Sequence, residues 1–203
     1  MNSFSLILVD PNPMLCQEWE NAFQEFDSVE VVNDYFEKLP VFDCMVSAAN
    51  SFGLMDGGVD LAIINFFGPQ LEREVQAHIL SRYWGEQSVG TSFIFPTAHP
   101  KHPYLAHTPT MRVPSNISHS DNVYLAMKAM LEAVHHHNEQ SATPINTLAC
   151  PGLGTSTGRV PYPKAARDMA MAYRNYLNPP SRIDWNYATY RQHEVKYGKK
   201  PFQ

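Results

Sequence analysis

Two glycine-rich segments contain the residues of this chain that are best suited to chemistry on a ligand. The first covers residues 46–60 and reads VSAANSFGLMDGGVD, and the second covers residues 149–159 and reads ACPGLGTSTGR. Glycine lets the main chain approach a ligand closely. A helix that follows such a segment leaves its first backbone N–H groups free to bind an anion. Two segments of this kind predict a ligand held between a pair of phosphate-binding loops.

Neither segment is a standard nucleotide-binding motif. The second has the spacing Gly-x-Gly-x-x-x-Gly from Gly152 to Gly158, which is one residue longer than a dinucleotide-binding fingerprint. It also lacks the Lys-Ser/Thr ending of a P-loop, so the pattern disfavours ATP hydrolysis. We expect a side chain placed at Gly57 or Gly154 to intrude where the backbone must approach a phosphate.

Alternating strands and helices are expected to position these loops. Short apolar runs bounded by turn residues predict strands at residues 6–9, 29–32, 44–48, 92–95, 104–107 and 147–149. Apolar residues at three- and four-residue spacing predict helices at residues 14–26, 59–67, 70–82, 121–137 and 164–177. This alternation predicts an α/β fold with a central sheet covered on both faces. Each glycine-rich segment then lies between a strand and a helix.

Composition and charge exclude several classes of protein. A chain of 203 residues with 44% hydrophobic content can bury one substantial core. The formal net charge of −5 argues against general nucleic-acid binding, which needs many clustered cations. Cys16, Cys44 and Cys150 are odd in number and lack the spacing of a zinc site, which indicates reduced thiols. No signal peptide or membrane span is recognisable, so we expect a soluble, cytoplasmic protein that does not bind membranes.

Histidine clusters offer an alternative reading as metal sites. His135, His136 and His137 are consecutive and therefore do not share one helix face. His99 and His102 lie in a proline-rich segment and have no third ligand at a recognisable spacing. We therefore expect surface histidines, and neither a metal site nor a cofactor.

The composition changes near residue 178. We expect one domain over residues 1–178 and a C-terminal extension of aromatic and basic residues over 179–203. The extension follows Asn178-Pro179-Pro180 and shows no clear period, which predicts an irregular segment. Because exposed aromatic patches are unfavourable, we expect it to pack back on the domain; a separate partner-binding peptide is the alternative.

Taken together, the motifs resemble those of macro domains, and of their MacroD-like branch in particular. Ser47-Ala48-Ala49-Asn50 and Gly57-Gly58-Val59-Asp60 are similar to the family's Asn-Ala-Ala-Asn and Gly-Gly-Val-Asp, with matching spacing, and residues 152–161 are similar to its second, phosphate-binding loop. Asn33-Asp34 stands where the family has Gly-Asp. The resemblance spans about residues 31–176. It implies a three-layer α/β/α fold with a central mixed sheet that binds ADP-ribose or a mono-ADP-ribosylated macromolecule.

The resemblance also implies roles for individual residues. Asp34 would contact the adenine, Asn50 would orient the distal ribose, and Asp60 would assist a hydrolytic water. The other implied ligand contacts are Ala48, Ala49, Asp56, Gly57, Gly58, Val59, Gly152, Gly154, Thr155, Ser156, Thr157, Gly158 and Arg159. The alternatives are structural: Asp34 as a turn cap, Asn50 as a turn residue and Asp60 as a partner of the helix dipole.

Two departures from the family pattern bear on activity. Ser47 replaces the usual first asparagine, and Asp56 stands where the family has another glycine. Three functions therefore stay open. The first is hydrolysis of mono-ADP-ribosyl linkages or of a related ADP-ribose derivative. The second is a non-catalytic reader, which binds ADP-ribose without cleaving it. The third is a structural or interaction protein that keeps the fold but no longer binds the ligand because of Asp56.

Overall fold

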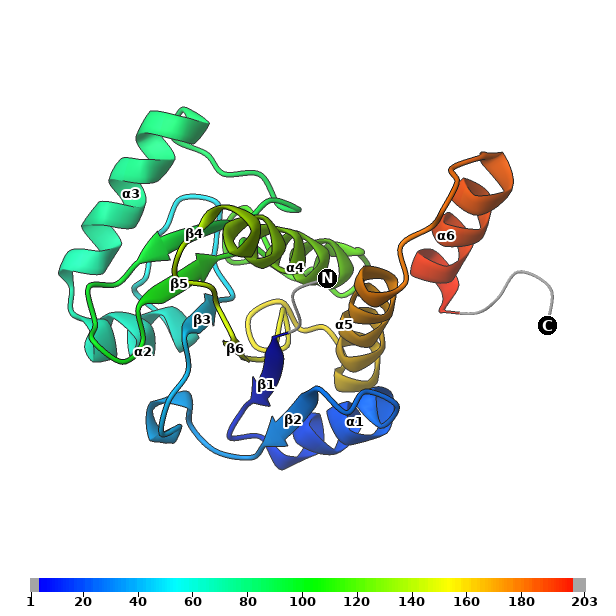
Figure 1. Ribbon diagram of the computed structural model, residues 1–203, viewed down its shortest axis with the longest axis horizontal. Coiled ribbons are helices and arrows are strands. Elements are labelled where there is room, and N and C mark those ends of the chain that lie inside the picture. The colour runs from blue at the N-terminus through cyan, green and yellow to red at the C-terminus, as the bar shows by residue number, and fades with distance from the viewer. Residues whose placement is uncertain (1–3, 199–203) are drawn as a thin grey trace.

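A six-stranded sheet forms the centre of the structure, a computed structural model that describes residues 4–198 (Figure 1). Its strands are β1 (Ser5–Val9), β2 (Val29–Val32), β3 (Cys44–Ser47), β4 (Phe93–Pro96), β5 (Tyr104–His107) and β6 (Thr147–Cys150). Their order is β2-β1-β6-β3-β5-β4, with every pair parallel except β4 and β5. The predicted strands are confirmed to within one residue at each end, and so is the mixed sheet.

Helices cover both faces of this sheet. The α-helices are α1 (Pro13–Phe23), α2 (Gly58–Phe67), α3 (Gln70–Tyr83), α4 (Asn122–Gln140), α5 (Tyr162–Leu177) and α6 (Trp185–Tyr197), of which the first five cover the sheet. Figure 1 shows α2 and α3 on one side of the sheet and α1, α4 and α5 on the other. The expected three-layer α/β/α arrangement is therefore confirmed.

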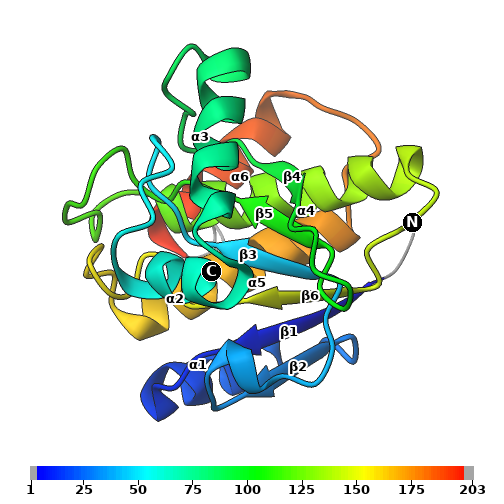
Figure 2. The same ribbon diagram turned by 90° about the vertical axis from the view of Figure 1, so that its left-hand side faces the viewer.

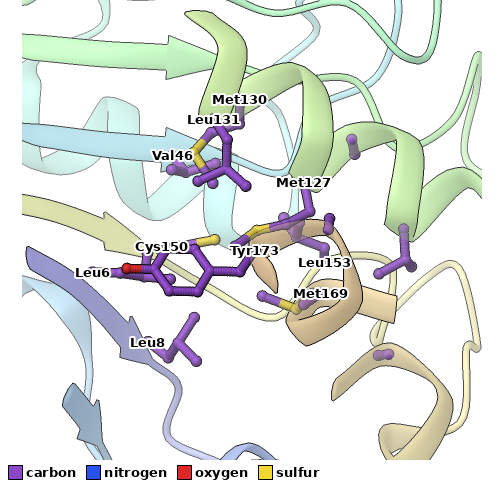
Figure 3. Packing of buried hydrophobic residues seen from close by; sticks show 14 of the residues in the cluster. Leu6, Leu8, Val46, Met127, Met130, Leu131, Cys150, Leu153, Met169 and Tyr173 are labelled. Carbon is purple, nitrogen blue, oxygen red and sulfur yellow. The ribbon is translucent and has the colours of Figure 1, made fainter. Parts of the chain in front are cut away.

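Side chains that alternate along each strand divide between two hydrophobic clusters. Leu6 and Leu8 of β1 pack with α1, α4 and α5, whereas Ile7 and Val9 pack with α2 and α3. Figure 3 shows the first cluster, which includes Leu6 and Leu8 of β1, Cys150 of β6 and Tyr173 of α5. Burial on both faces explains why β1 is a continuous apolar run, as is typical of parallel strands.

The carboxyl ends of β1, β6 and β3 meet at one edge of the sheet. These strands lie side by side in Figure 2, because β6 pairs with β1 on one side and with β3 on the other. The first glycine-rich loop follows β3 and the second follows β6. In open α/β sheets, the crevice outside these carboxyl ends is where ligands bind.

The C-terminal segment is helical, so the expectation of an irregular extension is wrong. Asp184 begins α6, and its side chain accepts a hydrogen bond from the backbone N–H of Tyr187 at 2.9 Å. No residue of α6 is buried, so the helix has no apolar stripe that could reveal it in the sequence. Arg191 donates to the hydroxyl of Tyr124 on α4 at 3.0 Å. The domain boundary at residue 178 stays a prediction, and residues 199–203 of the extension lie outside the described residues.

The structure also shows the state of the cysteines and the lengths of the helices. Cys16, Cys44 and Cys150 are buried and unpaired, as predicted for thiols. Burial raises the pKa of the Cys150 thiol, which makes it unreactive. Across residues 4–198, every helix is too short or too polar to cross a lipid bilayer.

Candidate ligand-binding site

A cavity of about 410 Å³ lies at the carboxyl edge of the sheet. Both glycine-rich loops line it, together with the end of β1, the start of α2 and residues near Tyr35 and Thr110. The sequence-predicted residues in the lining are Ala48, Ala49, Asn50, Asp56, Gly57, Gly58, Val59, Asp60, Gly152, Gly154, Thr155, Ser156, Thr157 and Gly158. The structure thus brings together residues that are about 100 positions apart in the sequence.

Asp34 and Arg159 lie outside this lining. The carboxylate of Asp34 accepts hydrogen bonds from Lys38 Nζ at 2.7 Å and from the backbone N–H of Tyr35 at 2.8 Å. The hydrogen bond from Lys38 holds the pKa of Asp34 below its usual range. Arg159 has a φ of 53° and donates its backbone N–H to Ser156 at 3.0 Å, closing the turn of the second loop. A ligand contact by either residue stays a prediction.

Asn50 shapes the first loop with its side-chain amide. Its Oδ1 accepts from the backbone N–H groups of Phe52 at 3.0 Å and Leu54 at 3.3 Å, and its Nδ2 donates to the Leu54 carbonyl at 2.7 Å. Asn50 therefore holds the turn through its side chain, but its backbone is not left-handed as the turn alternative implied, and it also lines the cavity.

Helix α3 fastens the same loop from behind. Glu72 Oε1 accepts from the backbone N–H of Met55 at 2.9 Å, and Gln76 Nε2 donates to the carbonyl of Gly53 at 3.1 Å. Met55 is fully buried against α3. These contacts hold the backbone at Gly53 and Met55 in place, directly before Asp56.

Asp60 is a buried carboxyl group on the first turn of α2. Its Oδ1 accepts a hydrogen bond from Ser47 Oγ at 2.7 Å, which gives a role to the serine that departs from the family pattern. Burial raises the pKa of Asp60 from 3.8 to about 6, with smaller contributions from the negative charges of Asp56 and Glu72. The hydrogen bond from Ser47 opposes this rise. A carboxylate with such a pKa is suited to act as a general base near neutral pH.

The start of α2 presents bare backbone to the cavity. Gly57 is extended, with a φ of −155°, and Gly58 has a φ of +57°. A Cβ atom on either glycine would meet nothing within 4 Å. The first N–H groups of a helix have no partners within the helix, so this end can bind an anion.

The glycines of the second loop are required by its tight turn. A Cβ on Gly158 would lie 2.4 Å from the carbonyl oxygen of Gly154, and a Cβ on Gly152 would lie 2.5 Å from Thr155 Oγ1. At Gly154, where φ is +70°, a Cβ would approach Ile117 and Val123 of the core. The expectation that a side chain at Gly154 would intrude on a phosphate is therefore wrong, because that position faces the core.

Asp10 also lines the cavity, although no motif in the sequence pointed to it. It follows β1, and its Oδ1 accepts from the backbone N–H of Asn12 at 2.9 Å. Partial burial raises its pKa, which a hydrogen bond from the backbone of Gly152 opposes. A carboxylate directly after a buried parallel strand was the available signal. Tyr35, Phe36, Glu37 and Thr110 were missed as well.

The histidines considered as metal ligands have other neighbours in the described residues. Nowhere in residues 4–198 do three or more His, Cys, Asp or Glu side chains gather in a way that could hold a metal ion. The side chains of His135 and His136 instead lie 3.3 Å from the carboxylate of Glu139. The expectation of a surface histidine is wrong for His102, which is 4% exposed and stacks on the ring of Phe42 with the ring centroids 3.9 Å apart.

A family model described as Macro domain matches residues 46–169. An uncharacterized protein of Aquifex aeolicus (strain VF5) is 33% identical over 136 residues, which cover 66% of this chain and 74% of that protein.

Solved structures give the same fold. A point mutant of the Oceanobacillus iheyensis macrodomain with ADP-ribose has a TM-score of 0.60 and 18% identity, covering 94% of this chain and 92% of that chain. The macrodomain of Mycobacterium tuberculosis DarG has a TM-score of 0.56 and 17% identity, covering 70% of this chain and 87% of that chain. On the family match and the Aquifex relative, this chain belongs to the macro domain family.

Proposed function

We propose that this protein binds ADP-ribose and hydrolyses mono-ADP-ribosyl linkages. The observation that carries the proposal is the position of Asp60, a buried carboxyl with a pKa of about 6 that lines the cavity between two glycine-rich loops. The similar macrodomain of O. iheyensis was solved with ADP-ribose, which supports the choice of ligand.

The two loops suit a diphosphate. One phosphate would meet the N-terminus of α2 at Gly57 and Gly58, where anions are favoured. The other would meet the backbone N–H groups and hydroxyls of Thr155, Ser156 and Thr157. A non-catalytic reader would need the same contacts, so only turnover separates the two functions.

Hydrolysis in this site needs only water. Asp60 would take a proton from a water molecule as the water oxygen attacks the anomeric carbon of the distal ribose. The bond from that carbon to the acceptor group breaks, and the proton that Asp60 has taken up passes to the departing acceptor. Asn50, which also holds the loop, would orient the ribose.

Calorimetric titration with ADP-ribose, AMP and ATP tests the binding step. We expect ADP-ribose to bind more tightly than AMP, because only ADP-ribose fills both loops and the distal end. Equal affinity for the two ligands would contradict the two-loop model. Release of ADP-ribose from mono-ADP-ribosylated protein tests catalysis, and binding without release would leave the reader function.

We place the adenine of ADP-ribose at the end of the cavity near β1. Asp10 lines this end, whereas Asp34 lies outside the lining and is paired with Lys38. We expect Asp10→Ala to weaken ADP-ribose binding by about ten- to a hundredfold, since a lost hydrogen bond to a charged group is worth roughly 1.5–3 kcal/mol. Asp34→Ala should change the affinity by less than a few fold.

An analogue lacking the amino group of adenine, inosine diphosphate ribose, provides the control for this prediction. If Asp10 accepts from that amino group, the wild type should prefer ADP-ribose to the analogue and Asp10→Ala should lose the preference. If Asp34→Ala loses the preference for ADP-ribose over the analogue and Asp10→Ala keeps it, then Asp34 and not Asp10 recognises the adenine. Melting temperatures show whether Asp10→Ala also loosens the second loop.

A further inference from the structure

The cavity lining is acidic. It contains the carboxylates Asp10, Glu37, Asp56 and Asp60, and among the described residues no lysine, arginine or histidine lines it. Two cations on flanking segments are engaged elsewhere, since Lys38 pairs with Asp34 and Arg112 pairs with Glu86. Within this lining, a ligand diphosphate would therefore meet backbone N–H groups and hydroxyls, with the exposed Arg159 of the second loop just outside it, and any further charge on the ligand would face carboxylates.

Asp56 is the carboxylate best placed to act on such a charge. Its neighbour Met55 is buried and donates a hydrogen bond through its backbone N–H to Glu72, and its other neighbour is Gly57, the N-cap residue of α2. The side chain of Asp56 is exposed and lines the cavity. Within residues 4–198 it makes neither a side-chain hydrogen bond nor an ion pair, so its charge is not compensated.

The negative charge of Asp56 acts on Asp60, the proposed general base. Together with Glu72, it contributes to raising the pKa of Asp60. Under the proposed function, Asp60 and Asn50 mark the end of the cavity that receives the distal ribose. The group attached to the anomeric carbon would then emerge beside Asp56, where it meets a negative potential. Such a potential attracts a cation and repels a phosphate over several ångströms, and salt screens both effects.

We propose that Asp56 selects ADP-ribosyl linkages whose acceptor group is cationic, such as the guanidinium of arginine, and rejects distal riboses that carry a phosphate. This inference rests on the proposed function and names its substrate class. It also gives a role to the carboxylate that replaces a glycine of the family motif, and it opposes the reading of Asp56 as a residue that has spoiled the pocket.

Three ligands that differ at the distal ribose test the inference by calorimetry at low and high salt. They are ADP-ribose, NAD⁺, which carries a cationic nicotinamide there, and ADP-ribose 1″-phosphate, which carries an added phosphate. We expect the wild type to bind the 1″-phosphate at least about tenfold more weakly than ADP-ribose, which corresponds to about 1.4 kcal/mol. Added salt should reduce the difference.

Two substitutions at the same position separate charge from shape. Asp56→Asn keeps the size and removes the charge. Relative to ADP-ribose, it should bind the 1″-phosphate about tenfold more tightly than the wild type does, and it should bind NAD⁺ more weakly. Asp56→Glu keeps the charge and should retain both wild-type preferences. In release assays, Asp56→Asn should lower turnover of arginine-linked substrate relative to glutamate-linked substrate.

The outcomes distinguish this inference from the proposed function. A wild type that binds ADP-ribose, with ligand ratios that Asp56→Asn leaves unchanged, would overturn the inference alone. The same holds if Asp56→Glu behaves like Asp56→Asn, because charge would then not be the cause. A wild type that binds none of the three ligands would overturn the proposed function together with the inference.

Discussion

Asp60→Asn should abolish most turnover while making the fold more stable at neutral pH. The amide cannot take a proton from water, and general-base assistance typically contributes roughly 10²- to 10⁴-fold to a rate. Binding of ADP-ribose should change far less, because the lost interaction matters mainly in the transition state. Initial rates of release and calorimetric affinities, measured on the same preparations, check both expectations.

The stability gain follows from the raised pKa of Asp60. The native state holds this proton up to a pH of about 6, whereas the unfolded chain loses it near 3.8. Wild-type stability therefore falls as the pH rises between these values, by up to about 3 kcal/mol for roughly two pKa units. Asparagine does not titrate and still offers an acceptor to Ser47 Oγ. The melting temperature of the variant should exceed that of the wild type at pH 7.5 and not at pH 4.

The pH profile of the wild type provides a further check on Asp60. Its turnover should decline below a pH of about 6, where the carboxyl group becomes protonated. A flat profile between pH 5 and 8, or full activity of Asp60→Asn, would remove Asp60 from the mechanism.

Gly57→Glu should abolish ADP-ribose binding and leave the fold intact. The extended φ of −155° suits any residue, and the added Cβ meets nothing within 4 Å, so the variant has no steric reason to unfold. Its side chain would enter the place where a phosphate meets the helix N-terminus, with a charge of the same sign. Losing two charge-assisted hydrogen bonds of about 1.5–3 kcal/mol each lowers the affinity by about a hundredfold or more. Calorimetry with circular dichroism measures both effects.

Two other glycine substitutions are matched controls for Gly57→Glu. Gly57→Gln has a similar size without the charge, so it should bind more tightly than the glutamate variant while remaining weaker than the wild type. Gly158→Ala should reduce the melting temperature, because its Cβ would collide with the carbonyl of Gly154. Wild-type affinity in Gly57→Glu would show that α2 does not hold a phosphate.

The regular elements of the fold were predictable because their burial leaves a pattern. Strands buried on both faces appear as short apolar runs, as β1 and β3 do, and α5 shows its apolar stripe clearly. Helix α6 has no buried residue, so periodicity could not reveal it. Sheet order was not predictable either, since the pairing of β6 between β1 and β3 depends on packing that no local pattern encodes.

The candidate site was predictable where its residues lie in one contiguous motif. The two loops were found from glycine spacing, and the structure places both at one cavity. Asp10 was missed because it reaches the cavity only through the position of β1 beside β6. The hydrogen bond from Ser47 to Asp60, 13 positions apart, was not predictable either, because it forms only when α2 packs against β3.

The central place of β6 has a consequence for how the chain folds during synthesis. This strand is the last of the six to emerge from the ribosome, and it pairs with β1 and β3, which were made about 140 and 100 residues earlier. Until it inserts, the sheet consists of two separate halves, β2-β1 and β3-β5-β4. Pairing over such sequence distances slows folding, and unpaired strand edges favour aggregation. Since the second loop follows β6, the nascent chain acquires its binding cavity in the same late step that closes the sheet.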